Sequence, residues 1–238
     1  MKSIHFKSID STSSYLKVNY NKYKNLTFVS TDFQSKGHGR NGREWVSKEK
    51  ENLLFSILIK DEDLIKKYDC LSLASSVCIY EVLMNLGIEN VSIKWPNDVL
   101  VNDKKICGIL LESVSSGSNI EALVLGVGLN VNSKEFSNMI IFPTSIQLET
   151  NKKISLKTVK KCVYEKFIKM FENIKRNESS YLDTIKNNNY LKNKKVYALI
   201  EGKKQFVEVI DINEDNSLKI KSGEEYKNVY SGEITFHV

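Results

Sequence analysis

Residues 34–45 carry the side chains with the clearest chemical purpose in this sequence. Three glycines, two arginines, a lysine and a histidine lie between Gln34 and Trp45. Glycine lets a backbone approach a ligand closely, and arginine offers a planar, permanently charged fork that matches carboxylate and phosphate oxygens. A flexible cationic loop that ends in a tryptophan suits an anionic ligand with an apolar body. A basic surface loop without a ligand is the alternative that this segment alone leaves open.

A second polar group follows a short apolar run, in the order Lys94-Trp95-Pro96-Asn97-Asp98. Proline cannot donate to a strand ladder, so the chain must break there, and the lysine, asparagine and aspartate gather at the break. Lys105 and Gly108 lie on the next expected strand, where simple alternation places the two positions on opposite faces. A proline turn with solvated charges is the alternative.

Composition narrows the class of protein that could use these residues. The 238 residues carry a formal net charge of +6, and 41% of them are hydrophobic, as in an ordinary globular protein. The lysine excess is diluted among asparagines, which favours an anionic small ligand over DNA. The four cysteines form no C-x-x-C pair and only three histidines are present, so no metal site is predicted. No apolar run matches a membrane span or a signal peptide, and we expect a cytoplasmic protein with reduced thiols.

The polar segments are placed between strands and helices that the apolar patterns predict. Two glycines, Gly126 and Gly128, interrupt one expected strand, and glycine inside a strand often marks the close approach of a ligand. A cap within residues 10–13 opens the first helix. The expected strands are 3–8, 26–30, 52–59, 91–94, 99–101, 105–112 and 120–130, and the later helices are 63–86, 155–175 and 178–187.

The pattern changes near residue 187, after which only short strands with turn residues follow. Five short strands within about 45 residues are typical of a small SH3-like β barrel. We therefore expect two domains, residues 1–187 and 188–238. The expected strands of the second domain are 196–201, 205–213, 217–221, 227–230 and 234–238.

Taken together, the motifs of this chain resemble those of the biotin protein ligases. The resemblance begins at Asp10-Ser11-Thr12-Ser13 and ends at Gly232-Glu233-Ile234, so it covers nearly the whole chain. Its four ordered motifs are Gln34-x-x-Gly37-x-Gly39-Arg40-x-Gly42-Arg43-x-Trp45, Lys94-Trp95-Pro96-Asn97-Asp98, Lys105-x-x-Gly108-Ile109-Leu110-x-Glu112 and Gly126-Val127-Gly128-Leu129-Asn130.

The resemblance implies an α+β fold. A mixed, largely antiparallel sheet packs with helices in a class II synthetase-like catalytic domain, and a small SH3-like barrel follows it. It implies an enzyme that joins biotin and ATP, with Mg²⁺, into biotinyl-5′-AMP and releases pyrophosphate. The biotin is then transferred to one lysine of a biotin carboxyl carrier domain of a carboxylase. The resemblance implies neither DNA nor a membrane as partner, and either a monomer or a homodimer.

Site residues carry over by matched position. Two departures matter: His38 and Ser13 stand where the family often has a basic residue and asparagine. The residue that stacks on adenine has no matched position, and Phe142 is the candidate for it. The implied catalytic residues are Arg40, Lys94, Asp98 and Lys105. The implied biotin-binding residues are Ser11, Thr12, Ser13, Gln34, Gly37, His38, Gly39, Arg40, Lys105 and Gly108. The implied ATP-binding residues are Arg40, Arg43, Trp45, Lys94, Asn97, Lys105 and Asn130.

Two other functions remain as alternatives at this point. A lipoate–protein ligase shares the related fold and the adenylation chemistry, but its Arg-Arg and Gly-rich H-D-x-x-N pattern is not found in this sequence. A biotin-binding sensor without transfer activity is the second alternative. Some family members carry an N-terminal DNA-binding domain, and the motif that starts at Asp10 leaves no room for one in this chain.

Overall fold

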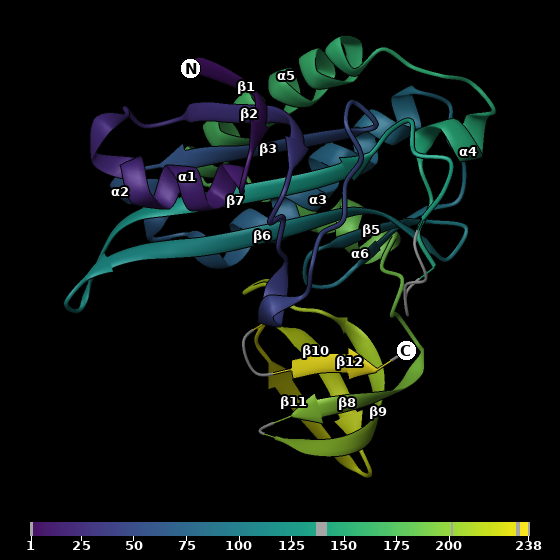
Figure 1. Cartoon of the computed structure of the whole chain (residues 1–238). Helices are drawn as coiled ribbons and strands as arrows, with labels where there is room; N and C mark the ends of the chain where they lie inside the picture. The colour runs from purple at the N-terminus through teal and green to yellow at the C-terminus, as the bar shows by residue number, and fades with distance from the viewer. Residues whose placement is uncertain (1, 137–141, 201, 232–233, 238) are drawn as a thin grey trace.

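The main body of the molecule is a seven-stranded mixed sheet with helices on both faces (Figure 1). The computed structural model describes residues 2–136, 142–200, 202–231 and 234–237. The strand order is β1-β2-β3-β7-β6-β5-β4; β1 and β2 run parallel, and every other neighbouring pair is antiparallel. The strands are β1 (Ser3–Ile9), β2 (Thr27–Gln34), β3 (Asn52–Ile59), β4 (Val91–Lys94), β5 (Asp98–Val101), β6 (Lys104–Ser116) and β7 (Asn119–Asn130). The predicted mixed, largely antiparallel sheet is confirmed.

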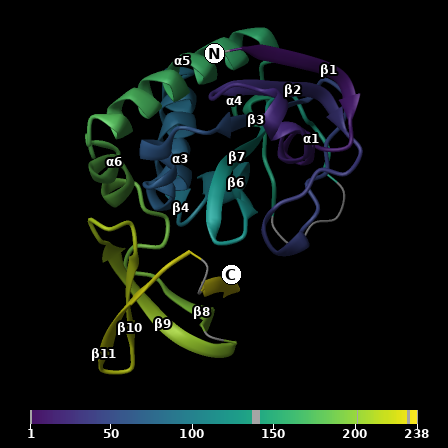
Figure 2. The same cartoon turned by 90° about the vertical axis from the view of Figure 1, so that its left-hand side faces the viewer.

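The two faces of this sheet are covered differently (Figure 2). On one face, α3 (Tyr68–Asn85) and α5 (Leu156–Lys175) pack over the largest hydrophobic core. On the other face, the short α1 (Thr12–Asn19) buries Leu16 against strand residues such as Val29. The second face is therefore only partly covered, and it is the face on which the polar motifs gather.

One predicted helix is divided in the structure. The expected helix 63–86 is broken into α2 (Glu62–Ile65) and α3, with Lys67 in a non-helical conformation between them. The apolar spacing did not reveal the break because Leu64 and Leu71, on either side of it, pack into the same core. Asp61 caps α2, and Gly87 ends α3 with a φ of +76°, as its position predicted.

The remaining helical segments are short. The structure adds α4 (Ile146–Thr150), which the sequence analysis did not predict; Ser145 caps it by accepting a hydrogen bond from the Leu148 amide. α6 (Tyr181–Asn187) follows α5. Single 3₁₀ turns occupy Tyr20–Lys22 and Arg40–Gly42.

A second, strongly curved sheet of five antiparallel strands follows α6 (Figure 1). Its core is continuous with part of the first unit, since Trp95 and Val77 cluster with Val196 and Ile220. The division at residue 187 stays a prediction, because the two sheets share these apolar contacts. The order is β11-β10-β9-β8-β12, with β8 (Lys195–Ile200), β9 (Lys203–Ile212), β10 (Leu218–Ser222), β11 (Glu225–Val229) and β12 (Ile234–His237).

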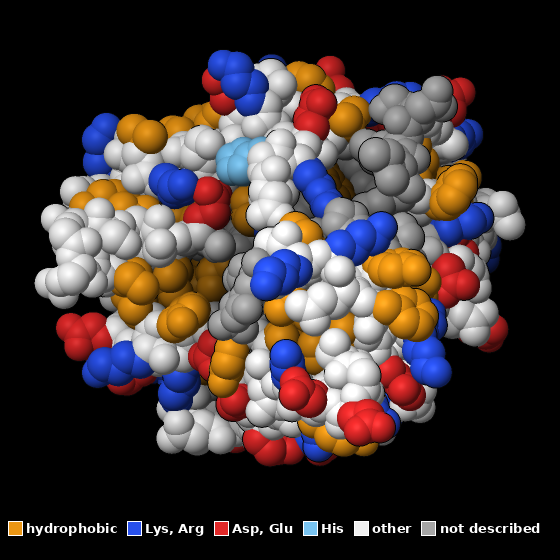
Figure 3. Space-filling view, turned by 90° about the horizontal axis from the view of Figure 1, so that it is seen from below, with side chains coloured by type: hydrophobic (Ala, Val, Ile, Leu, Met, Phe, Trp, Pro, Cys, Tyr) orange, Lys and Arg blue, Asp and Glu red, His pale blue; other side chains and the backbone are white. Residues whose placement is uncertain are grey.

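The surface on the side of the five-stranded sheet is mixed in character. Hydrophobic and basic side chains lie next to one another there (Figure 3). Among the helices that the structure describes, none is long and apolar enough to cross a lipid bilayer.

Candidate active site

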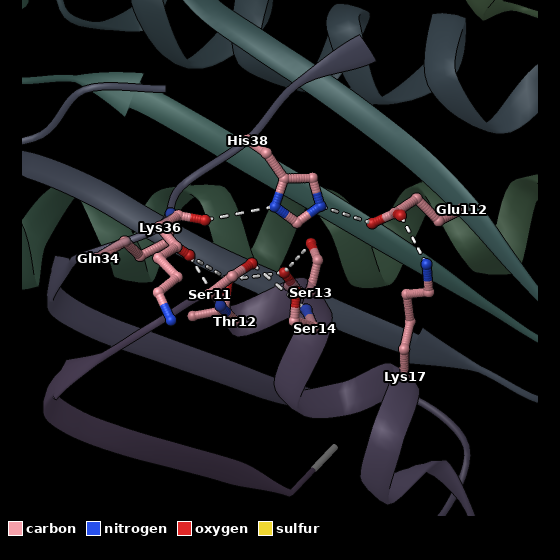
Figure 4. A network of polar contacts seen from close by, with 10 residues as sticks. Ser11, Thr12, Ser13, Ser14, Lys17, Gln34, Lys36, His38 and Glu112 are labelled. Atoms are coloured by element: carbon pink, nitrogen blue, oxygen red, sulfur yellow. Dashed lines mark hydrogen bonds and ion pairs between the residues drawn. The ribbon is translucent and has the colours of Figure 1, made fainter. Parts of the chain in front are cut away.

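A cluster of buried hydroxyl groups joins the start of α1 to the main sheet (Figure 4). The amide and hydroxyl of Thr12 donate to Gln34 Oε1 at 2.8 and 3.0 Å, and the Thr12 and Ser56 hydroxyls share a bond of 2.7 Å. Ser13 Oγ lies 2.9 Å from Ser56 Oγ. Ser11, the fourth hydroxyl of the group, caps the helix by accepting from the Ser14 amide at 3.3 Å. Sequence reasoning selected Ser11, Thr12, Ser13 and Gln34, and the structure brings them together.

This approach of helix to sheet depends on Gly126. A Cβ atom at this position would lie 2.5 Å from Ser13 Oγ. The interruption of β7 by glycine therefore lets α1 lie close to the strands. Ser56 was missed by the sequence analysis, because its polar side chain is only one position in a wholly buried strand.

The Gly/Arg loop, residues 34–45, is a compact turn held by hydrogen bonds of its own backbone. The Gly39 amide donates to the Arg43 carbonyl at 2.7 Å, and the Trp45 amide donates to the Gly37 carbonyl at 2.9 Å. A Cβ atom on Gly37 would lie 2.6 Å from the Trp45 carbonyl oxygen, so only glycine fits this crossing.

The Trp45 indole lies directly on two glycines that pair across neighbouring strands. Gly108 of β6 is opposite Gly128 of β7, and added Cβ atoms would meet the ring at 2.9 and 2.4 Å. The indole Nε1 is buried and has no hydrogen-bond partner among the described residues. A buried donor without an acceptor costs about 1–3 kcal/mol, so a ligand oxygen at this point would be favoured.

An ion pair between β5 and β6 stands next to this indole. Lys105 Nζ lies 2.7 Å from Asp98 Oδ1, and 5.7 Å from the centre of the Trp45 ring. Asp98 in turn is opposite Lys94 on β4 and opposite Gly108 on β6. The residues of two separate motifs therefore form one row across the sheet.

A β-bulge in β6 corrects one expectation about this row. Alternation was expected to separate Lys105 and Gly108, but an added Gly108 Cβ would lie 3.1 Å from Lys105 Cε. The pairing explains this: Val99 pairs with Cys107 and Leu100 with Lys105, which leaves Ile106 as an extra residue. Ile106 and Cys107 are both fully buried in the same core, so Lys105 is turned to the face of Gly108.

Arg40 reaches the same place from the Gly/Arg loop. Its Nη1 donates to Asn97 Oδ1 at 3.3 Å, while Asn97 Nδ2 donates to the Ile109 carbonyl at 2.7 Å. Its Nη2 donates to the carbonyl oxygen of Ser231, which lies two residues after the end of β11. The loop, the 94–98 turn and the five-stranded sheet therefore meet at one guanidinium group.

The positive charges in this cluster perturb one another. Burial lowers the pKa of Lys94, with Asp98 opposing the shift and Lys105 and Arg43 adding to it. Burial likewise lowers the pKa of Arg40, again against the pull of Asp98. Three partly buried cations around one carboxylate leave an excess of positive charge, which suits a ligand with several negative charges.

Glu112 is a further residue at this site that the implied site residues did not include. It accepts from Lys17 Nζ of α1 at 2.7 Å and from His38 Nε2 of the Gly/Arg loop at 3.3 Å (Figure 4). It thereby connects β6 to both covering segments. Its place at the end of the third motif was the signal that could have identified it.

Two predicted nucleotide contacts, Asn130 and Phe142, lie in different surroundings. Asn130 is 4% exposed; its side chain accepts from Asn52 Nδ2 and donates to the Thr144 carbonyl, both at 2.9 Å. Its role as an ATP contact stays a prediction, beside this structural role. Phe142 is 76% exposed, and its carbonyl accepts from the Lys105 amide at 2.9 Å, which places its backbone next to the cluster.

The residues present do not form a cage for Mg²⁺. Within the described parts of the chain, no group of three or more His, Cys, Asp or Glu side chains could hold a metal ion. Asp98 is the carboxylate within the cation cluster, and it is paired with Lys105. Mg²⁺ commonly binds through substrate phosphates and few protein ligands, and no step below depends on a metal held by the protein.

The sequence of this chain is similar to a protein family and to several known proteins. Residues 5–130, more than half of the chain, match the model of the biotin/lipoate A/B protein ligase family. The bifunctional ligase/repressor BirA of Escherichia coli is 32% identical over 133 residues, which cover 56% of this chain and 41% of that protein. The biotin--[acetyl-CoA-carboxylase] ligase of Paracoccus denitrificans is 34% identical over 123 residues, 49% of this chain and 51% of that one. The matches thus span about half or less of these relatives.

A solved structure matches over nearly the full length. The biotin protein ligase of Aquifex aeolicus, in complex with biotin and ATP, superposes with a TM-score of 0.86 at 29% identity. The match covers 99% of this chain and 98% of that one, including both sheets. The chain belongs to the biotin/lipoate A/B protein ligase family.

Proposed function

We propose that this protein is an ATP-dependent biotin protein ligase. It joins biotin and ATP into biotinyl-5′-AMP, and then transfers biotin to a lysine of a biotin carboxyl carrier domain. The observation that carries the proposal is that a cluster of hydroxyl groups and a cluster of cations lie on the same face of the main sheet. Buried hydroxyls around Thr12 lie at one end, and the cations around Asp98 lie at the other. Gly126 and Gly128, two residues apart on β7, connect these ends.

The cation cluster fits the first step. A carboxylate oxygen of biotin bonds to the α-phosphorus, and the bond to the pyrophosphate leaving group breaks. Two anions must approach each other, so Arg40, Lys94 and Lys105 lower their repulsion and stabilise the charge on the phosphoryl oxygens. Removing one such group typically lowers kcat by a factor of about 10²–10³.

The second step needs a neutral amine near the mixed anhydride. The acceptor lysine attacks the carbonyl carbon, the C–N bond forms, and AMP leaves. Asp98 is 17% exposed at the side chain and lies where it can orient the amine or accept its proton. We infer that Asp98→Asn slows transfer to the acceptor more than it slows adenylation.

The hydroxyl cluster distinguishes biotin from lipoate. The ureido ring of biotin offers two N–H donors and a carbonyl acceptor, whereas the dithiolane ring of lipoate offers none of these. A site built from Thr12, Ser13, Ser56 and Gln34 would leave polar groups unpaired around lipoate, which strongly disfavours it. The names of relatives such as the Paracoccus ligase support the same choice and point to a carboxylase carrier domain as acceptor.

The test measures pyrophosphate release with ATP and either biotin or lipoate, each with and without a carrier domain. We expect release with biotin alone, and more on adding the carrier domain. Thr12→Val should raise the KM for biotin, while Ser14→Ala, on the exposed side of the same helix, should leave it unchanged. Release with lipoate alone would replace this proposal by a lipoate ligase. Biotin binding without release would indicate a sensor.

A further inference from the structure

The turn between β9 and β10 reaches across from the second sheet to the 94–98 motif. The indole Nε1 of Trp95 donates to the backbone carbonyl of Asn216 at 3.0 Å. Trp95 is 1% exposed, although it lies between the charged residues Lys94 and Asp98. A residue of the turn between β9 and β10 is therefore in direct contact with Trp95, the second residue of the motif.

Asn216 is itself fixed from two directions. Tyr181 OH of α6 donates to its Oδ1 at 2.8 Å, and its Nδ2 lies 3.5 Å from Asp69 Oδ2 of α3. Its φ of +67° is a left-handed conformation that asparagine tolerates better than most residues. The side chain thus ties the turn to two helices while its carbonyl accepts the Trp95 bond.

The turn that presents Asn216 is also closed by internal hydrogen bonds. The Asn216 amide donates to the Asn213 carbonyl at 3.0 Å, and the Asn213 amide donates to the Ser217 carbonyl at 2.9 Å. The amide of the fully buried Ser217 donates to Asp215 Oδ1 at 3.1 Å. These bonds hold the carbonyl of Asn216 in one direction before Trp95 meets it.

The position of Trp95 also determines where the neighbouring charged residues lie. Ile93 and Trp95 face the apolar core shared with the second sheet, and alternation turns Lys94 to the opposite side, where it pairs with Asp98. The Ile93 amide also donates to the Asn188 carbonyl at 2.8 Å. A shift of the indole would therefore move Lys94 and Asp98 relative to Lys105.

We propose that Asn216 is a positioning residue: through Trp95 it holds the 94–98 turn so that Lys94 and Asp98 keep their places beside Lys105 and Arg40. The second sheet then acts on the chemistry as a fixed support. This inference rests on the proposed ligase function for its kinetic consequence, but the placement of Lys94 is measured independently of any activity.

The test compares Asn216→Ala and Trp95→Phe with Tyr197→Phe. The first two remove the side-chain anchor of the turn and the indole donor. The control removes a hydroxyl from a half-exposed tyrosine of the same sheet. We expect kcat for pyrophosphate release to fall about tenfold or more in both test variants, because displacements near 1 Å can cost about 10² in rate. The KM for biotin should stay unchanged, because Thr12 and Ser56 form their hydrogen bonds with each other and with Gln34 and Ser13.

The second readout is the pH dependence of Lys94 acetylation, followed by mass spectrometry. In the test variants Lys94 should become more solvated, so its pKa should rise toward the ordinary lysine value, while Tyr197→Phe leaves it unchanged. An unchanged Lys94 titration and kcat in folded Asn216→Ala and Trp95→Phe would overturn the proposal. If the wild-type protein released no pyrophosphate, the ligase function would fail, and the Lys94 titration would still decide the role of Asn216.

Discussion

Lys105 Nζ lies 2.7 Å from Asp98 Oδ1 because the β6 bulge turns Lys105 out of regular alternation. The two charged side chains form an ion pair between β5 and β6, and they are only 21% and 17% exposed. The neighbouring Gly108 has no side chain to block the approach to this pair. Lys105 is thus placed to contact a ligand oxygen while it stays paired with Asp98.

The first prediction concerns this lysine. Lys105→Gln should lower kcat for pyrophosphate release by about 10²–10³, because a preorganised cation is removed from the developing phosphoryl charge. Lys104→Gln is the matched control, since Lys104 is the preceding residue on β6 and is exposed. Equal activity of both variants in a steady-state assay would show that Lys105 has no part in adenylation.

The second prediction concerns the charge state of Lys94. Its pKa is lowered by burial, Asp98 raises it, and Arg43 lowers it. Asp98→Asn removes the favourable charge and should lower the pKa further, whereas Arg43→Gln removes a repulsive charge and should raise it. The rate of Lys94 acetylation as a function of pH reports both shifts.

At a fixed pH below the pKa, Lys94 should therefore react faster than wild type in Asp98→Asn and slower in Arg43→Gln. A shift of the same sign in both variants would contradict the arrangement of charges around Lys94. Lys161, an exposed lysine of α5, provides an internal reference for reagent activity in every sample.

The third prediction concerns the thiols. All four cysteines are free; Cys70, Cys78 and Cys107 are buried and Cys162 is half-buried. Burial raises the pKa of Cys70 to about 11, and it raises the pKa of Cys78 and Cys107 as well. Iodoacetamide at pH 8 should therefore label Cys162 first in the native protein, because the thiolate is the reactive species.

Mass spectrometry of tryptic peptides identifies the labelled site. Cys162→Ala should remove the fast phase, and denaturation in guanidinium should expose all four thiols. Rapid labelling of Cys107 in the native protein would contradict its complete burial between β5 and β7.

The strands of the main sheet could be predicted from sequence because their apolar residues and breaks are local signals. Every expected strand in residues 3–130 has a counterpart, and the cap at Ser11 opens α1 as predicted. The break at Lys67 could not be predicted, because the apolar spacing continues through it. The helix α4 was missed because five residues are too few for a periodic pattern.

The sequence predicted which residues belong to the site, but it did not predict how their side chains are arranged. The motifs named Lys105 and Gly108 together, but the bulge that puts them on one face depends on cross-strand pairing. The contact of Arg40 with Ser231 joins residues 191 positions apart, and no local spacing reports it. Asn130 was selected by its motif, whereas its hydrogen bond to Asn52 comes from the pairing of β3 with β7, and its bond to Thr144 comes from the segment after β7.

The fourth prediction concerns the close contact of Trp45 with the sheet. A Cβ atom at Gly128 would lie 2.4 Å from Trp45 Cε2, too close for any real contact. Gly128→Ala should therefore displace the indole and destabilise the protein by about 1–3 kcal/mol, as overpacking typically does. Urea denaturation measures this change in the free energy of unfolding.

The Trp45→Leu background separates this cause from a general effect of alanine in β7. With the indole removed, Gly128→Ala should cost much less, giving a coupling free energy of about 0.5–3 kcal/mol between the two positions. Gly39→Ala is the control within the loop, because its Cβ would lie an ordinary 3.7 Å from the nearest atom, the Arg43 carbonyl oxygen. Additive effects of Gly128→Ala and Trp45→Leu would mean that the indole does not rest on Gly128, and the row from Trp45 to Lys105 would then need another support.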